Sequence, residues 1–467
     1  MGQNILETIK EWVWGPWLLC LMLAIGIFYS LKSGFFQVRG VRTWWNATAG
    51  SMGETGKIKE RKENSISPFQ AACTALAATV GTGNIAGVAT ALVAGGPGAI
   101  FWMWLSSLVG MMTAYAENFL GILYREKGEE GRFYGGPMQY IEKGMGKRPL
   151  AFIYAVCTIF ASFGMGCMVQ ANSMADTLQY AFSMPPFWTA AILTGGSALV
   201  LWGGIDRITK VTEKLVPCSA GIYLVLSGVV ILANIKEIPA VFQLIFREAF
   251  SVRSMAGGAI GYGISRGVFS NEAGLGSLAI LHSSTEDTTP QEQGMWGIFD
   301  VFFDTILMCT LTAVVILVQP KVRILLCGSA YGAEGLRFSS ADAPLNGAAL
   351  ASWAISQTVG NGGNSVIAGT MVCFAFATIL GWYYLGSQAA AYLLGDHLFL
   401  YRLFYLESIF FGCVLQLTFV WDLSDIFNGM MAVPNLIALF ALRKEIQFPV
   451  QEQKARNKKE RERKRRK

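Results

Sequence analysis

Charged residues and histidine are scarce in this chain, and their scarcity excludes most soluble folds. Of its 467 residues only 15% are charged, while 53% are hydrophobic and 12% are aromatic. An ordinary soluble domain is about a quarter charged. Only two histidines occur, His282 and His397, both at the ends of apolar segments, so we expect neither a histidine-based metal centre nor a histidine proton relay. The composition indicates a polytopic membrane protein.

The chain also lacks the motifs of several other protein classes. Its nine cysteines are spread singly and form no Cys-x-x-Cys pair, so we expect neither a disulfide framework nor a zinc site. The absence of a Gly-x-x-x-x-Gly-Lys-Ser/Thr loop disfavours an ATP-driven pump. Without a His-Glu-x-x-His motif or a cysteine–histidine pair, we do not expect an enzyme.

Long apolar runs occupy most of the sequence. At about 20 apolar residues per crossing, we predict about eleven membrane spans. They lie near residues 13–32, 69–93, 97–124, 150–182, 186–203, 211–233, 254–281, 294–318, 362–394, 401–421 and 423–442. The Gly-rich and more polar segment 343–360 is predicted to form a helix at one surface.

Lysine and arginine collect on one side of this predicted topology. That side comprises residues 33–66, 125–149, 204–210, 282–293, 395–400 and 443–467. The other side holds only Lys10, Lys236, Arg247, Arg253, Lys321, Arg323 and Arg337. Since cytoplasmic loops carry an excess of Lys and Arg, we expect a multi-pass protein of the plasma membrane with its N-terminus outside and its C-terminus in the cytoplasm.

Charged residues lie at the two ends of the chain, outside the first and last apolar runs. Glu7 and Glu11 precede the first apolar run and no small-residue cleavage site follows, so we expect this segment to be retained. From Lys454 to Lys467 nearly every residue is charged. We expect 443–467 to be a basic tail that fixes the topology, and attraction to anionic lipid is the alternative.

The span 69–93 is the most informative, because Val80-Gly81-Thr82-Gly83-Asn84-Ile85 interrupts it halfway across. Glycine and asparagine weaken a helix, and unwound backbone at membrane depth is tolerated only where protein, ions, water or ligand satisfy it. Close packing around small residues is the alternative, but packing does not require polar groups such as that of Asn84. We predict a lined cavity at this break.

The span 254–281 is interrupted in the same way. It contains seven glycines, at 257, 258, 261, 263, 267, 274 and 276. Setting aside 13–32 as an accessory helix leaves ten spans, which divide into a first repeat, 69–233, and a second repeat, 254–442. A discontinuous helix at the start of each repeat is typical of inverted-repeat secondary transporters. We predict an all-α fold with one transmembrane transporter domain, 1–442, followed by the tail 443–467.

Several runs of residues resemble a known family, the alanine or glycine:cation symporters. The runs are Thr79-Val80-Gly81-Thr82-Gly83-Asn84-Ile85-Ala86-Gly87, Gly95-Gly96-Pro97-Gly98, Gly135-Gly136-Pro137-Met138, Met168-Val169-Gln170-Ala171-Asn172-Ser173, Arg266-Gly267-Val268-Phe269-Ser270-Asn271-Glu272-Ala273-Gly274 and Phe302-Phe303-Asp304-Thr305. The resemblance extends from about Val13 to Arg443.

This resemblance implies the leucine-transporter fold, five-plus-five inverted repeats and import of alanine, glycine or a related small neutral amino acid with sodium. Proton coupling, and glutamine or serine as substrate, are the alternatives within the same fold. A non-transporting amino-acid sensor is the alternative from another class, although we expect no appended signalling domain. We expect no cofactor beyond the coupling ion, and no nucleic-acid or obligate protein partner apart from the surrounding lipid.

The backbone of the first break can serve both ligands. The amides of Thr82, Gly83 and Asn84, at the start of the second half-helix, can donate to the substrate carboxylate, helped by the helix dipole. Freed carbonyls from Ala77 to Val80 can coordinate a hard cation such as sodium. Each ligand would then fix backbone that the other needs, which gives a basis for coupling.

Side chains complete the predicted site. The resemblance implies that the Thr378 hydroxyl lies beside the cation carbonyls and that Gln170 faces the substrate, an interhelical hydrogen bond being the alternative for Gln170. We add Thr79 to the substrate site. Phe269 and Trp382 are predicted to be apolar walls or gates, with simple packing as the alternative.

Ionisable residues inside spans are rare and normally paired. We expect structural or gating roles for Glu117, Arg266 and Glu272. Glu117 would hydrogen-bond unwound backbone or offset Arg266, and direct ion coupling is the alternative. Asp300 and Asp304 lie four residues apart on one helical face, and we expect them to make helix-end or gate contacts near the cytoplasmic side. Gly81 and Asn271 are predicted to join the structural or gating group.

Three positions depart from the family pattern. Cys167 stands where the family typically has asparagine, and Ala377 stands where a serine usually precedes the threonine. The sequence after Trp382 lacks the usual glutamate. Loss of the serine would remove a hydroxyl ligand for sodium, which keeps proton coupling open as an alternative.

Overall fold

The computed structural model describes residues 2–54, 66–128, 133–252, 258–286, 288–328, 335–338, 344–395, 397–415 and 417–449. Within these ranges the chain is helical apart from one short hairpin, in which β1 (Glu126–Lys127) pairs antiparallel with β2 (Phe133–Tyr134). The tail from residue 450, Gly257, Arg253 and the basic residues Lys57, Lys59, Arg61, Lys62 and Arg132 lie outside the described residues.

The predicted accessory helix is longer than expected and bent. It consists of α1 (Gly2–Val13) and α2 (Pro16–Ser33), followed by α3 (Phe36–Arg39), α4 (Val41–Ala47) and η1 (Ala49–Glu54). Pro16 begins α2 at a position where its missing N–H costs nothing. Gly34 ends α2 with a positive φ of 70°. α1 packs along α23 and α2 packs against α7.

The helices of the predicted first repeat, 69–233, follow in order, and η5 and α13 come after them, between the two predicted repeats. They are α5 (Pro68–Thr79), η2 (Gly83–Gly87), α6 (Val88–Gly95), α7 (Gly98–Leu123), α8 (Pro137–Gln139), η3 (Tyr140–Gly144), α9 (Arg148–Ala161), η4 (Ser162–Met168), α10 (Val169–Phe182), α11 (Pro186–Leu201), α12 (Gly204–Ala233), η5 (Ile235–Glu237) and α13 (Ile238–Ala249). The stretches η2, η3 and η4 are π-helical. Such wide turns are frequent at functional sites.

The remaining helices belong to the predicted second repeat. They are α15 (Ala259–Asn271), α16 (Ser277–Ser283), α17 (Pro290–Val301), η6 (Phe302–Cys309), α18 (Thr310–Leu317), α19 (Pro320–Gly328), α20 (Gly347–Val359), α21 (Asn361–Leu394), α22 (Phe399–Val414) and α23 (Leu417–Ala441). α20 matches most of the predicted surface helix 343–360, although residue 343 lies outside the described residues.

Seven described helices are long and apolar enough to cross a membrane, and the bent pair formed by α5 and η2–α6 makes eight. The shorter α11 and α22 and the discontinuous pair α15–α16 account for the other spans predicted from the sequence. Eight of the eleven predicted spans are thus present among the described residues as seven helices and one bent pair of spanning length, and the other three correspond to shorter or discontinuous helices.

Both predicted breaks are present. Between α5 and η2 the axis bends by 47°. A capping box formed by Ser67 and Gln70 stabilises the start of α5. The helix therefore has a stabilised N-terminus, and it ends where the glycines of the break begin. The second break joins α15 to α16 through three residues with positive φ: Glu272, Gly274 and Gly276. Glycine adopts this conformation without steric cost.

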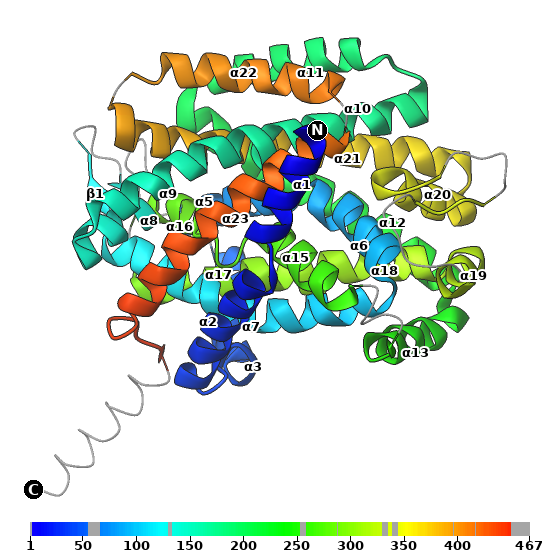
Figure 1. Cartoon of the computed structure of the whole chain (residues 1–467), viewed down its shortest axis with the longest axis horizontal. Helices are drawn as coiled ribbons and strands as arrows, with labels where there is room; N and C mark the ends of the chain where they lie inside the picture. Colours follow the sequence, from blue (N-terminus) through cyan, green and yellow to red (C-terminus); the bar gives the residue numbers. More distant parts are fainter. Residues whose placement is uncertain are drawn as a thin grey trace, which may run out of the picture.

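Interactions between distant residues define two sides of the molecule. On the side that we call the basic side, Arg125 donates to the carbonyl of Thr285, and Tyr392 donates to Glu142 at 2.6 Å. β1 and α8 mark this side at the left of Figure 1. On the opposite side, Asn234 donates to Thr358 at 3.2 Å, and α13, α19 and α20 mark that side at the right of Figure 1.

Two long helices hold the broken ones in place. α7 packs against α15, α16 and α17, and α21 packs against α5, α9, α10 and α12. Small residues allow close approach: a Cβ added at Gly381 of α21 would lie 3.1 Å from the amide nitrogen of Ala78. The two breaks therefore lie inside a scaffold of continuous helices.

Candidate functional site

At the first break, backbone amides donate to side-chain oxygens and not to helix carbonyls. Gly81 N–H donates to Asn84 Oδ1 at 2.9 Å, and Thr82 donates to Gln170 Oε1 through its amide at 3.3 Å and its hydroxyl at 3.0 Å. In a regular helix these two amides would bond to the carbonyls of Ala77 and Ala78. Those carbonyls therefore lose their helical donors while remaining in a buried segment.

Helix α21 closes the carbonyl side of this break. A Cβ added at Gly81 would lie 2.5 Å from Thr378 Oγ1 and 3.1 Å from Gln170 Oε1. The first distance is too short for a real Cβ and the second is tight, so glycine lets Thr378 and Gln170 approach this backbone together. The predicted neighbours Thr378 and Gln170 are thus both found beside Gly81, on two different helices.

The other residues predicted on the first broken helix are buried. Thr79 is 4% exposed and its hydroxyl donates back to Ala75 O at 3.3 Å. Val80 is fully buried, and its ψ of 88° turns the chain out of the helix. Gly83 faces Ser270 of the second broken helix, whose Cα would lie 3.3 Å from an added Cβ. The two broken helices therefore touch at their breaks.

Asp304 is the residue of this site that sequence reasoning missed. Asn84 Nδ2 donates to its Oδ1 at 2.7 Å, and Ser270 Oγ and Thr305 Oγ1 donate to its Oδ2 at 2.8 and 2.7 Å. The expected helix-end or gate contact is wrong, because Asp304 is completely buried against the first break. The sequence did contain a signal for this role, because Asp304 is a carboxylate within the apolar run 294–318.

At the second break the carboxylate of Glu272 bridges two helices. It accepts a hydrogen bond from Trp382 Nε1 at 3.0 Å and another from Ser277 Oγ. Asn271 stabilises the same turn, because its Oδ1 accepts from Ala273 N–H at 3.0 Å and its Nδ2 donates to Thr305 at 3.0 Å. The indole of Trp382 is thus fixed by a polar contact in addition to its packing.

Glu117 of α7 accepts a hydrogen bond from the unwound backbone, which is one of the two roles expected for it from the sequence. Its Oε1 accepts from Gly274 N–H at 2.9 Å and from Asn435 Nδ2 at 2.6 Å, and Asn435 accepts from the Tyr140 hydroxyl. The alternative, that Glu117 offsets Arg266, is wrong. Arg266 instead pairs with Asp425 of α23 at 3.4 Å.

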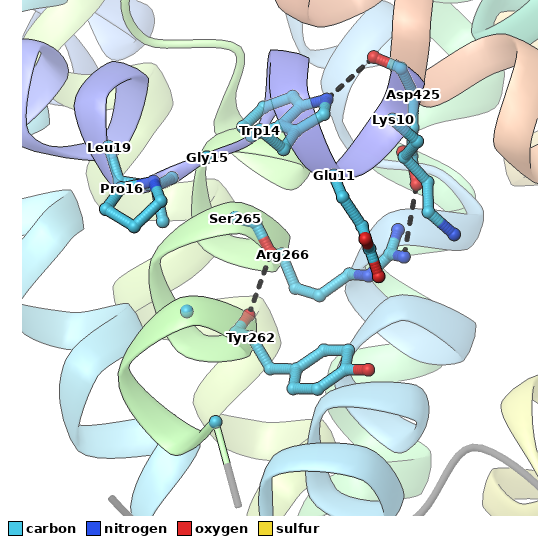
Figure 2. Close-up of a pocket in the computed structure, with 12 residues that line it drawn as sticks. Lys10, Glu11, Trp14, Gly15, Pro16, Leu19, Tyr262, Ser265, Arg266 and Asp425 are labelled. Atoms are coloured by element: carbon cyan, nitrogen blue, oxygen red, sulfur yellow. Dashed lines mark hydrogen bonds and ion pairs between the residues drawn. The ribbon is translucent and has the colours of Figure 1, made fainter. Parts of the chain in front are cut away.

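A cavity of about 310 Å³ opens beside this ion pair, toward α1. Figure 2 shows its lining, with the Arg266 side chain reaching across to Asp425 and with Glu11 of α1 pointing toward it. Trp14 Nε1 donates to the backbone carbonyl of Asp425 at 2.7 Å. The guanidinium of Arg266 also lies 5.4 Å from the ring centre of the buried Phe269. Phe269 thus lies between packing neighbours and one member of this ion pair.

The arrangement suits binding of a small ligand. Among the described residues there is no group of three or more His, Cys, Asp or Glu side chains able to hold a metal ion. What the site offers instead is a set of amides, freed carbonyls, hydroxyls and carboxamides enclosed by apolar side chains. Such a site can hold a ligand that carries opposite charges a short distance apart.

Comparison with known proteins agrees with this chemistry. The chain matches the sodium:alanine symporter family over residues 1–467. It is 40% identical over 449 residues to the sodium/alanine symporter AgcS of Methanococcus maripaludis, covering 94% of each protein. It is 36% identical over 455 residues to the probable sodium/glutamine symporter GlnT of Bacillus subtilis, covering 95% of this chain and 90% of that protein.

Among solved structures, the crystal structure of MhsT in complex with L-phenylalanine is similar in fold. The TM-score is 0.59 at 14% identity, and the match covers 82% of this chain and 90% of MhsT. The expected leucine-transporter fold is confirmed by this match.

Proposed function

Because the chain belongs to the sodium:alanine symporter family, we propose that this multi-pass membrane protein imports a small neutral amino acid, alanine or glycine, together with sodium. Family membership makes it a transporter and not an enzyme. The observation that carries the proposal is the first break, where Gly81 and Thr82 donate their amides to side chains and leave two buried carbonyls without helical donors.

The substrate carboxylate binds at the amino end of η2. Gln170 Oε1 now accepts both Thr82 donors, and a carboxylate oxygen offers the same acceptor chemistry with a full charge. Charge-assisted hydrogen bonds are about twice as strong as neutral ones. In this mechanism the amide and hydroxyl of Thr82 break their hydrogen bonds to Gln170 and donate to the substrate carboxylate instead. The side-chain amide of Gln170 then forms a hydrogen bond with the bound amino acid.

Sodium binds at the carboxyl end of α5, at the carbonyls of Ala77 and Val80 and the hydroxyl of Thr378. Hard cations prefer oxygen ligands of this kind. Since the same short segment offers carbonyls to the cation and amides to the carboxylate, binding of one ligand orders backbone that the other needs. This shared segment is the proposed basis of symport.

Small substrates fit this site best. Phe269 and Trp382 are 2% and 0% exposed, and Gly81 is in close contact with Thr378 and Gln170, which leaves little room for a long side chain. Glutamine is the second candidate, because the similar GlnT is named as a probable sodium/glutamine symporter.

We further propose that the two predicted repeats, 69–233 and 254–442, work as halves of one transport domain in the plasma membrane. The basic side faces the cytoplasm in this proposal, because positive residues are retained on the cytoplasmic face. The N-terminus then lies outside, and the cavity lined by Arg266 and Asp425 opens toward the external solution.

Uptake into proteoliposomes tests the proposed function. Radiolabelled alanine, glycine, serine and glutamine are offered under a sodium gradient and, separately, under a proton gradient. We expect alanine or glycine to accumulate when sodium is imposed. If glutamine alone accumulates, the substrate is glutamine and not alanine or glycine. If uptake occurs only under a proton gradient, the coupling ion is the proton and not sodium. Failure to accumulate any amino acid under either gradient would refute the proposal.

A further inference from the structure

His282 is completely buried between two acceptors. It lies in α16, the half of the second broken helix that follows the break, and both its neighbours come from α17. Its Nε2 is 2.8 Å from Asp300 Oδ2, and its Nδ1 is 2.7 Å from Gln293 Oε1. The sequence led us to expect no histidine relay, and the contacts of His282 give a reason to reconsider that expectation.

The number of protons in this group follows from hydrogen bonding. A neutral imidazole carries a single N–H and can donate to only one neighbour. Gln293 Nε2 lies 3.2 Å from Thr288 Oγ1 and its Oε1 faces the ring, but a hydroxyl can donate as well as accept, so the amide can stand either way round. With Nε2 toward the ring, the contacts to Asp300 and Gln293 need no extra proton. With Oε1 toward the ring, as found here, these contacts need one proton more than a neutral histidine and a carboxylate hold together.

Burial favours the same proton count. Asp300 is 1% exposed, and its Oδ1 has no hydrogen-bond partner among the described residues. With the extra proton the pair is neutral overall, whether as imidazolium and carboxylate or as imidazole and carboxylic acid. Without it the pair carries one negative charge, and burial makes this state the less favourable of the two.

The pair connects the substrate region with the surface of the basic side. Thr288 is half-buried and lies 3.4 Å from Glu292 Oε2, which is exposed. In the other direction, Asp304 follows Asp300 by four residues along the same helical segment and contacts Asn84 at the first break. Polar groups thus extend from the surface, through Gln293, His282 and Asp300, toward the proposed substrate site.

We propose that His282 and Asp300 form a proton-binding site on the path between the first break and the basic side, and that its occupancy controls transport. This inference rests on the proposed function. The bound proton keeps α16 joined to α17. When the proton leaves Nδ1 for water, the Gln293 amide turns over, so that its Nε2 donates to Nδ1 and its Oε1 accepts the Thr288 hydroxyl hydrogen. Gln293 and Nδ1 stay hydrogen-bonded with and without the extra proton, so the site can change between the two protonation states.

Asp304 on the same helical segment and Cys73 on α5, with Glu213 of α12 beside Cys73, interact with Asp300. Further titratable or charged groups lie around the pair: Glu272, at the break before α16, interacts with Asp304, Tyr115 of α7 lies against Gly294, next to Gln293, and Arg125 donates to the carbonyl of Thr285 just after α16. All of them are retained in the variants below, so a change in pH dependence reports on the pair.

Nuclear magnetic resonance can count the protons directly, because the chain has only two histidines. Full-length protein labelled with [15N]histidine is compared with the H397Q variant, which removes the exposed His397 and leaves the signal of His282. We expect both ring nitrogens of His282 to be bonded or shared with protons at pH 6, and one nitrogen to lose its proton as the pH rises. A His282 that stays neutral with one bare nitrogen from pH 6 to pH 8 overturns the proposal.

Transport provides the second measurement. Sodium-driven alanine uptake is measured in proteoliposomes while the pH is changed on one side at a time. In wild type and H397Q, we expect uptake to change by about threefold or more between pH 6 and pH 8 on one side only, the range in which histidine titrates. In D300N, which keeps an acceptor for Nε2 without the charge, and in H282Q, we expect the profile to flatten. A D300N profile equal to that of wild type overturns the proposal.

The two measurements separate the two hypotheses. If wild-type protein accumulates no amino acid while His282 shows the extra proton, the proposed function fails and the proton-binding site stands. If alanine accumulates under a sodium gradient and His282 shows no extra proton, the reverse holds.

Discussion

Glycine at position 81 decides how closely two helices approach the first break. The G81A variant would place a Cβ 2.5 Å from Thr378 Oγ1 and 3.1 Å from Gln170 Oε1. Overpacking of this kind costs about 1–3 kcal/mol, and here it displaces the groups proposed to hold sodium and substrate. We expect amino-acid uptake to fall to about a tenth or less, because 1.4 kcal/mol corresponds to a factor of ten. Initial uptake rates per amount of purified protein measure this.

The matched control is Gly87, at the end of η2, the helical stretch that follows the break. A Cβ there would meet nothing within 4 Å, so G87A should insert and transport like wild type. Equal loss of uptake in G81A and G87A would show that flexibility of η2, and not the contact with Thr378, is what Gly81 provides.

Gln170 offers a second test at the scale of single residues. The Q170A variant removes the acceptor of both Thr82 donors and the proposed contact to the substrate. We expect KM for the transported amino acid to rise about tenfold with a smaller change in the maximal rate, as befits a lost binding contact. Concentration dependence of uptake measures this.

Asn172 of α10 serves as its control. Its Nδ2 donates to the carbonyls of Gly412 and Leu415 at 2.9 Å, so N172A should lower thermal stability and leave KM unchanged. An unchanged KM in Q170A would assign to Gln170 the interhelical role that the sequence left open.

At the scale of whole helices, the breaks were predictable and their supports were not. Gly81-Thr82-Gly83-Asn84 and the glycines of 254–281 have weak helical propensity, a local property, so the sequence alone located both interruptions. Asp304 and Asn435 are separated from Asn84 and Glu117 by hundreds of residues. Their contacts follow from which helices pack together, and single-sequence patterns do not report that.

Glu117 tests whether the second break needs a charge or only an acceptor. Its Oε1 alone accepts from Gly274 and Asn435, while Oε2 has no partner among the described residues. The E117Q variant can keep that oxygen, so we expect it to fold and transport. The E117A variant leaves both donors buried without an acceptor, at about 1–3 kcal/mol each, and we expect its melting temperature in detergent to fall by several degrees. A matching loss in E117Q would show that the charge itself is required.

At the scale of the whole molecule, orientation is the feature that interactions inside the protein do not fix. We expect Cys327 of α19, which is exposed on the side opposite the basic side, to react with a membrane-impermeant maleimide in intact cells. In a C327S background, the H397C variant places a thiol at an exposed position between α21 and α22. That thiol should react only in inside-out vesicles.

The reverse pattern of labelling would place the basic side outside and contradict the proposed orientation. The C327S variant without a new cysteine gives the background from the remaining thiols.

The sequence by itself determined the class, the approximate number of spans and the two places where helices break, because apolar length, helix propensity and charge asymmetry are written in local stretches of residues. Only the tertiary structure decided what each broken segment touches. The interior of a helical membrane protein is assembled from residues far apart in the chain, so the partners of Asn84, Glu117 and His282 became visible only once the helices were packed.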